Sequence, residues 1–165
     1  MLDDDIISFS RVEKGKTTKY HPSILINVLK MFSESGLAMM GLEYQQYAWS
    51  QNKTFSMYKA CDCCVFFDSE KTANAHYDLN MRMKEDRDFN IQVAMLGLKF
   101  GRLNCVAMSV PTLGSNEGGL HDIYGEDEKY AEILCMKWGP KVCKLVRKKG
   151  GRVDCKIDFK KLANP

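Results

Sequence analysis

The chain has 165 residues, of which 45% are hydrophobic and 27% are charged, and its formal net charge is +3. This length allows one domain with a substantial core. Acids and bases are nearly balanced, so the net charge by itself is no argument for nucleic-acid binding. Seven cysteines form an odd set without the spacing of a disulfide framework. Their spacing favours a reduced, cytoplasmic protein, and no apolar stretch is long enough to cross a membrane, so no membrane partner is expected.

The first 36 residues predict one strand end, one loop and one helix. Residues 1–7, MLDDDII, have the pattern of a buried strand that runs into an acidic loop, and the polar residues 11–21 are typical of a surface loop. Pro22 suits the first position of a helix, because apolar residues then recur at helical spacing. Gly36 is expected to end that helix.

Residues 37–68 predict two strands that are separated by a polar loop. The first, residues 37–44, is LAMMGLEY, and the second, residues 58–68, is YKACDCCVFFD. The loop between them covers residues 45–55. An irregular stretch follows at residues 69–83, where no period of 2 or 3.6 is visible.

The second half predicts two more helices and a third strand. Residues 84–101 form a helix with acids in its first turn, as the helix dipole favours, and residues 102–110 form an apolar strand that Pro111 stops. Residues 111–120 are a glycine-rich loop. A further helix follows, with a buried stripe made of Tyr130, Ile133, Leu134 and Trp138.

The carboxy-terminal pattern predicts a β-hairpin. Apolar and charged residues alternate from Val153 to Phe159, after a turn formed by Gly150 and Gly151. The expected fold class is therefore α/β: a single domain over residues 1–165, with a mixed sheet, flanking helices and a carboxy-terminal β-hairpin.

The cysteines of CDCC allow two interpretations. Cys61 and Cys64 have the spacing of one zinc-ligand pair, but the sequence holds no second pair. Burial as small apolar residues of the strand explains them better.

Asp3, Asp4 and Asp5 are the first candidate site. Alternate residues of an extended chain point the same way, so Asp3 and Asp5 could share a hard cation such as Mg²⁺ or Mn²⁺. An exposed acidic turn or a helix cap is the alternative.

Glu85 and Asp86 are the second candidate site, at the start of the helix over residues 84–101. A carboxylate in this position can act as a general base towards a hydroxyl substrate. The alternative is a helix cap with acids that the dipole favours.

The glycine-rich loop and three aromatic residues complete the candidates. Consecutive glycines let the backbone approach a ligand closely, and His121 after them could contact a metal or a phosphate, although a lone histidine is more often structural. Tyr44, Tyr47 and Trp49 could stack on a sugar or a base, or could pack simply.

The order of these pieces resembles a GT-A type glycosyltransferase. MLDDDI, then KEDRDFNIQVAMLGLKFG, then the segment from SNEGGLH to the terminal strand are similar to the glycosyltransferase-like proteins of bacteriophages. Those proteins are related to TET-associated glycosyltransferases, which are proposed to modify hydroxymethylated bases in DNA. Membership in this group implies host cytoplasm as the location.

The resemblance implies a role for each candidate. Asp3 and Asp5 would hold Mn²⁺ or Mg²⁺ on the diphosphate of a nucleotide-sugar donor, and Glu85 and Asp86 would face a hydroxyl acceptor, with Asp86 as the preferred base. The remaining positions would contact substrate: Asp4, Tyr44, Trp49, Asn116, Gly118, Gly119 and His121. His121 departs from the family pattern, which has a polar residue and an arginine there.

The position of the acidic motif also departs from the family. In GT-A domains the motif follows a nucleotide-binding half, whereas here it begins at the third residue. Three explanations stay open: a truncated chain, a start assigned to an internal methionine, or a rearranged fold. A fragment is preferred, so the chain is expected to be the acceptor-side part of such an enzyme, without its amino-terminal nucleotide-binding half. Two other functions stay open: a catalytically degenerate binding or assembly module of the same fold, and a metal-dependent nuclease.

Overall fold

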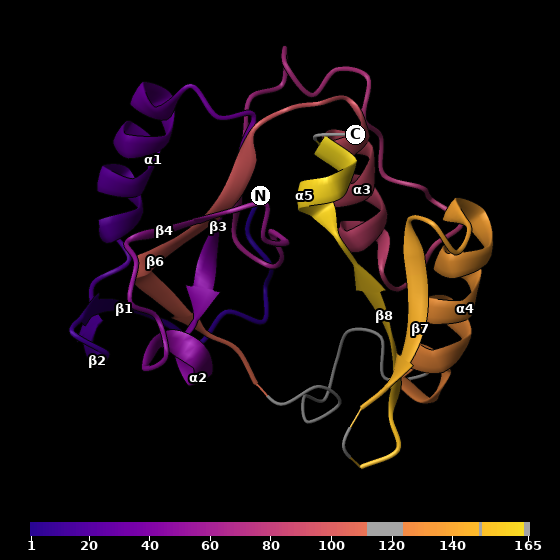
Figure 1. Ribbon diagram of the computed structural model, residues 1–165. Helices are drawn as coiled ribbons and strands as arrows, with labels where there is room; N and C mark the ends of the chain where they lie inside the picture. Colours follow the sequence, from indigo (N-terminus) through magenta and orange to yellow (C-terminus); the bar gives the residue numbers. More distant parts are fainter. Residues whose placement is uncertain (112–123, 149, 164–165) are drawn as a thin grey trace.

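A mixed sheet forms the centre of the fold, and helices cover both of its faces (Figure 1). The computed structural model describes residues 1–111, 124–148 and 150–163. The strands have the spatial order β2 (Lys16–Tyr20), β1 (Ser8–Glu13), β6 (Phe100–Ser109), β3 (Met39–Tyr44) and β5 (Val65–Phe67), and β4 (Phe55–Met57) also pairs with β6. Only the β3–β6 pair is parallel among these described strands. The predicted class, α/β with a mixed sheet and flanking helices, is confirmed.

Neighbouring residues of β3 show how the sheet divides the core. Met39 packs with Phe89 of α3 (Glu85–Met95) and with Phe159 of α5 (Phe159–Ala163) in one apolar cluster. Met40 points to the opposite face and belongs to the cluster of α1 (Ile24–Ser35). This alternation is the ordinary consequence of a strand buried on both faces.

The first 21 residues depart from the predicted pattern. Residues 11–21 do not form a loop, because β1 and β2 pair as an antiparallel hairpin whose turn holds Lys14 and Gly15 at positive φ. Every residue of β2 is exposed, so the strand carries no apolar alternation. The strand end predicted at residues 1–7 is reduced to one antiparallel bridge between Leu2 and Cys64.

The helix after Pro22 has the predicted end but a later start. Gly36 adopts the left-handed conformation that ends α1, with φ 69°, and Val28 and Phe32 lie on its buried face. Pro22 lies in the preceding turn rather than in the first helical position, and α1 begins at Ile24.

The segment after β3 contains more regular structure than predicted, and the next strand is shorter. The supposed polar loop holds the short helix α2 (Gln45–Ala48) and the first residue of β4. Of the strand predicted over residues 58–68, only β5 remains. Cys63 has a positive φ of 55°, which an extended strand does not permit.

The last elements confirm the predicted helix, strand and hairpin. The helix α3 lies within its predicted range, α4 covers Asp127–Trp138, and β7 (Cys143–Arg147) pairs with β8 (Val153–Ile157). The strand β6 begins at Phe100, which the sequence assigned to the preceding helix. Phe159 begins α5 and does not continue the strand. Figure 1 shows α4 lying against the hairpin, on the far side of α3 from α1.

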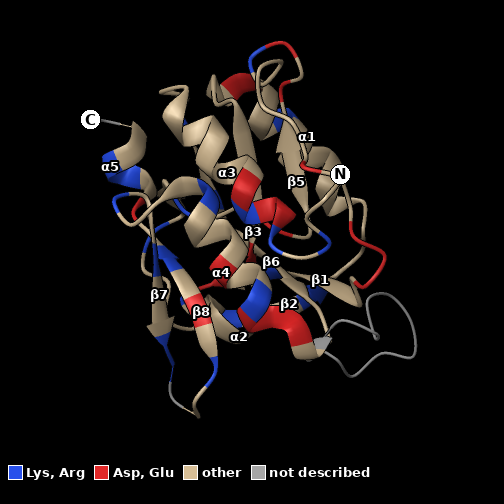
Figure 2. Ribbon diagram, turned by 90° about the vertical axis from the view of Figure 1, so that its right-hand side faces the viewer, with Lys and Arg blue, Asp and Glu red and all other residues tan. Residues whose placement is uncertain are grey.

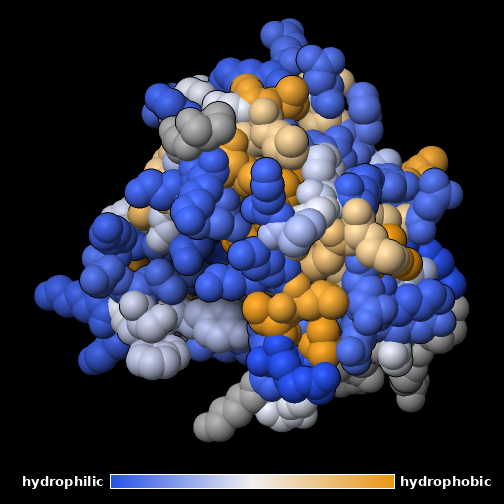
Figure 3. Space-filling view, turned by 45° about the vertical axis from the view of Figure 1, so that its right-hand side comes forward, coloured by the Kyte–Doolittle hydropathy of each residue, from blue (hydrophilic) through white to orange (hydrophobic). Residues whose placement is uncertain are grey.

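One face of the molecule is largely polar (Figure 3). In the view of Figure 3 it is largely hydrophilic, and hydrophobic residues reach it in smaller groups. Within the described ranges, none of the helices has both the length and the apolar character that crossing a membrane requires.

Candidate functional site

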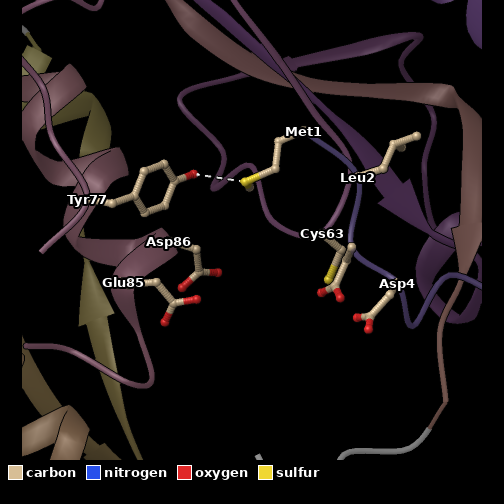
Figure 4. Close-up of a pocket in the computed structure, with 8 residues that line it drawn as sticks. Met1, Leu2, Asp4, Cys63, Tyr77, Glu85 and Asp86 are labelled. Carbon is tan, nitrogen blue, oxygen red and sulfur yellow. Dashed lines mark hydrogen bonds between the residues drawn. The ribbon is translucent and has the colours of Figure 1, made fainter. Parts of the chain in front are cut away.

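A pocket of about 490 Å³ separates the amino-terminal residues from the start of α3. Figure 4 shows Glu85 and Asp86 on one side of it, and Cys63 and Asp4 on the other. The pocket therefore brings together acids from the two candidate sites. Its lining consists of Met1, Leu2, Asp3, Asp4, Cys63, Tyr77, Glu85 and Asp86.

Backbone pairing positions the amino-terminal wall. The N–H of Asp3 donates to the carbonyl of Cys63 at 2.8 Å, and the N–H of Val65 donates to the carbonyl of Met1 at 3.0 Å. These two bonds hold residues 1–3 against the segment that leads into β5. Asp3 is the last residue held by these backbone bonds, and it lines the pocket together with Asp4.

The three aspartates form a compact acidic cluster. One carboxylate oxygen from each of Asp3, Asp4 and Asp5 lies within 4.8 Å of the others. Asp3 and Asp4 line the pocket and are exposed, whereas Asp5 is half-buried and lies outside the lining. Carboxylate oxygens are the ligands that Mg²⁺ and Mn²⁺ prefer, but exposed acids also gather where no ion binds. The cluster permits a metal and does not by itself assign one.

A buried ion-pair network fixes the opposite wall. Lys84 precedes α3 in the left-handed conformation, with φ 65°, and its ammonium group pairs with Asp127 and with Asp154. The Lys84 side chain is only 11% exposed. Because Asp127 begins α4 and Asp154 lies in β8, the network ties the start of α3 to both elements (Figure 2).

Asp86 has an unusual electrostatic environment. Burial raises the pKa of its carboxyl well above the ordinary value of 3.8, and the neighbouring Asp62 raises it further, while Arg87 opposes them. One carboxylate oxygen of Asp86 accepts the backbone N–H of Arg87 at 2.7 Å. Its side chain is 27% exposed and lines the pocket, so a proton held there can reach a ligand.

Asp62 lies behind Asp86, buried at 4% exposure. Its Oδ2 accepts hydrogen bonds from Arg87 and from Arg102, each at 3.4 Å. Its Oδ1 has no hydrogen-bond partner among the described residues. A protonated Asp86 can donate a hydrogen bond to Asp62, which explains why two carboxyl groups are tolerated so close together.

Glu85 responds to the aspartates across the pocket. Burial raises the pKa of its carboxyl, and the charge of Asp3 raises it further. Burial likewise raises the pKa of Asp3. The two acidic walls thus interact electrostatically, and each makes the other easier to protonate.

Arg102 pairs with buried carboxylates next to the site. It donates to Glu43 at 3.0 Å and to the carbonyl of Ala60, and its side chain is 13% exposed. The guanidinium also lies 5.3 Å from the centre of the Tyr44 ring. Arg102 therefore compensates two buried carboxylates, those of Glu43 and Asp62.

The predicted aromatic contacts lie outside this pocket. Tyr44 lies behind it, where its hydroxyl contacts the Sγ of Cys63 at 3.3 Å and its ring faces Arg102. Trp49 is 73% exposed, and its indole N–H donates to the carbonyl of Gln46. Neither ring is placed to stack on a ligand of the pocket.

The predicted contacts in the glycine-rich loop are not described. Asn116, Gly118, Gly119 and His121 lie outside the described residues.

Tyr77 and Cys63 line the pocket and were not predicted. Tyr77 belongs to the irregular stretch, where its ring stacks on Phe89 at 4.6 Å between centroids. Its hydroxyl donates to the sulfur of Met1 at 3.5 Å, and burial raises its pKa to about 12. No sequence signal identifies Tyr77, because its place depends on stacking against α3.

Cys63 differs from its neighbours. Cys61 and Cys64 are buried, as the core interpretation predicted, and the thiol of Cys61 donates to the carbonyl of Gly101. Cys63 instead faces the pocket. Among the described residues, Asp3, Asp4 and Asp5 form the group in which three possible metal ligands lie close together. The cysteines of CDCC do not belong to it.

Asp88 shows that the acids of α3 do not share one role. It is fully buried and accepts hydrogen bonds from Trp138 at 2.6 Å and from Gln92 at 2.8 Å. Lys137 pairs with it at 3.0 Å. Asp88 therefore joins α3 to α4 and faces away from the pocket.

Comparisons with known proteins add no assignment to this geometry. No protein-family model matches the chain, and neither a curated protein nor a solved structure matches it.

Proposed function

We propose that the chain takes part in metal-dependent transfer of a sugar from a nucleotide-diphosphate donor to a hydroxyl acceptor, as in GT-A glycosyltransferases. One observation carries the proposal: Asp4 faces Glu85 and Asp86 across a single pocket, which Asp3 also lines (Figure 4). A transferase of this kind needs both groups, one for the departing diphosphate and one for the attacking hydroxyl. The acceptor class extends to a hydroxymethylated base in DNA.

The aspartate wall is suited to the donor. The oxygens of Asp3, Asp4 and Asp5 offer a hard cation several ligands within a small volume. A bound Mn²⁺ or Mg²⁺ would neutralise charge on the diphosphate. The backbone bonds of residues 1–3 fix where these carboxylates lie.

The wall formed by α3 is suited to the acceptor. A hydroxyl that enters the pocket can donate its hydrogen bond to the carboxylate of Asp86, which then takes the proton as the hydroxyl attacks. The raised pKa of Asp86 makes its carboxylate a stronger base than an ordinary aspartate. Glu85 beside it holds the acceptor by a second hydrogen bond.

Calorimetry with Mn²⁺ and UDP tests the proposal. The unchanged protein is expected to bind UDP only when Mn²⁺ is present, and a variant with Asp3→Ala and Asp5→Ala is expected to lose that binding. A variant with Glu34→Ala and Glu128→Ala is the matched control, because it removes the same charge from exposed positions away from the pocket. Equal binding by both variants, or no binding by the unchanged protein, would contradict the proposal.

A further inference from the structure

Three cysteines meet where α4 packs against the hairpin of β7 and β8. Cys135 lies in α4, Cys143 begins β7 and Cys155 lies in β8. The thiols of Cys135 and Cys143 are in contact, with 2.8 Å between their sulfur atoms. Cys143 also shares a hydrogen bond with Cys155. Since Cys143 pairs with Ile157 in the hairpin, Cys155 is its diagonal neighbour on the same face.

A second pocket, of about 600 Å³, opens onto two of these thiols. Its lining includes Cys135 and Cys143, and it also includes the apolar side chains of Met136, Pro140 and Leu145. Cys135 is half-buried, whereas Cys143 is almost completely buried. A small molecule in this pocket therefore meets Cys135 first, and Cys143 lies directly behind it.

The cluster holds one thiol that ionises easily. The hydrogen bond from Cys143 lowers the pKa of Cys155 to about 7, and the charges of Arg87 and Lys84 assist, against the effect of burial. The same hydrogen bond raises the pKa of Cys143, and burial raises that of Cys135. The two shifts have opposite directions, so Cys143 is the proton donor of this pair and Cys155 is the acceptor.

We propose that Cys135 and Cys143 are a thiol–disulfide exchange site, which a low-molecular-weight disulfide oxidises to an intramolecular disulfide bond. The short distance between the two sulfur atoms carries the proposal, because a disulfide bond needs them about 2 Å apart and little movement is required. The pocket supplies access for the small disulfide, and its residues are separate from those of the acidic pocket.

The exchange balances in two steps. Cys135 attacks one sulfur of the small disulfide, so that its own proton leaves with the departing thiol and a mixed disulfide remains on Cys135. Cys143 then attacks the sulfur of Cys135, while its proton passes to the thiolate of Cys155 and the second small thiolate departs. Two protein thiols are oxidised, and one small disulfide is reduced to two thiols.

Oxidised glutathione is the probe for the full chain after reduction and removal of the reductant. The unchanged protein is expected to lose two of its seven thiols and two hydrogens of mass, and to retain no glutathione. Peptide mapping is expected to find Cys135 joined to Cys143. Seven free thiols, a retained glutathione adduct as the final product, or a bond between other cysteines would each overturn the proposal.

Variants separate the two steps. Cys143→Ser is expected to stop at a glutathione adduct on Cys135, and Cys155→Ser is expected to slow the second step by about tenfold, because the proton acceptor is lost. Cys105→Ser is the matched control and is expected to behave as the unchanged protein. Mapping of the unchanged protein decides the proposal even where a serine variant folds poorly, and none of these measurements depends on nucleotide or sugar.

Discussion

Asn90 pairs with the backbone of Cys61 through both ends of its side-chain amide. Its Oδ1 accepts the N–H of Cys61 at 2.8 Å, and its Nδ2 donates to the carbonyl of Cys61 at 3.0 Å. The same Nδ2 donates to the carbonyl of Asp86 at 2.7 Å. Asn90 thus locks the acid-bearing turn of α3 to the segment that holds Asp62 and Cys63.

Loss of this amide is expected to destabilise the protein. Asn90→Ala leaves the backbone groups of Cys61 buried without their partners, so the free energy of unfolding should fall by about 2–3 kcal/mol. Urea denaturation measures the change. Asn52→Ala, at an exposed position, is the control and is expected to change stability by less than about 0.5 kcal/mol. Equal stability of the two variants would show that the amide is not required.

The longer helices α1, α3 and α4 and the apolar strands β3 and β6 could be predicted from the sequence, whereas the short helices α2 and α5 could not. The helices α1 and α4 carry apolar residues at helical spacing, and β3 and β6 are rich in apolar residues. The hairpin of β1 and β2 could not, because β2 contacts solvent along its whole length and is held by backbone pairing. Periodicity reports burial of side chains, so an exposed edge strand leaves no pattern.

The candidate site could be predicted only in part. Asp3 and Glu85 were identified as chemically capable groups, and the fold brings them to one pocket. Asp62 and Arg102 were missed because the sequence alone does not distinguish the charged residues of a buried ion pair from those exposed to solvent. Their burial follows from packing between segments about 40 residues apart, which no local pattern reveals.

Asp154 is expected to stabilise the fold at neutral pH. Burial disfavours its charge, but the hydrogen bond from Lys148 and the charge of Lys84 outweigh burial and hold its pKa below 3.8. A lowered pKa adds stability at pH values above 3.8, the pKa of the unfolded state. This contribution is lost as the pH falls towards the pKa of the folded state. Asp154→Asn should therefore cost about 3 kcal/mol at pH 7 and progressively less as the pH falls below 3.8.

Denaturation at several pH values measures this dependence. Glu13→Gln is the control, because Glu13 forms an exposed pair with Arg11 and is expected to cost less than about 1 kcal/mol at any pH. A loss in Asp154→Asn that is as large at pH 2 as at pH 7 would show that charge is not the cause.

Asp86 is expected to have the opposite effect on stability. Its pKa in the folded state lies above the unfolded value of 3.8. Its contribution to stability is therefore complete below pH 3.8 and is lost as the pH rises through the folded pKa. Asp86→Asn removes this titration. The variant should gain stability relative to the unchanged protein between pH 4 and pH 8, as measured by urea denaturation. Parallel pH profiles for the two proteins would contradict the raised pKa.

The same substitution separates binding from transfer, if the proposed function holds. Asp86→Asn leaves the aspartates of the opposite wall intact, so calorimetric binding of Mn²⁺ and UDP should change by less than about twofold. Transfer from UDP-glucose to DNA with hydroxymethylated bases should fall by about 10²–10⁴-fold, because the proton acceptor is lost.

The matched control is Asp78→Asn, which also replaces a carboxylate but lies outside the pocket. Equal transfer by the Asp86 and Asp78 variants would show that Asp86 takes no part in the reaction. Nucleotide binding without transfer by the unchanged protein would instead favour a binding module.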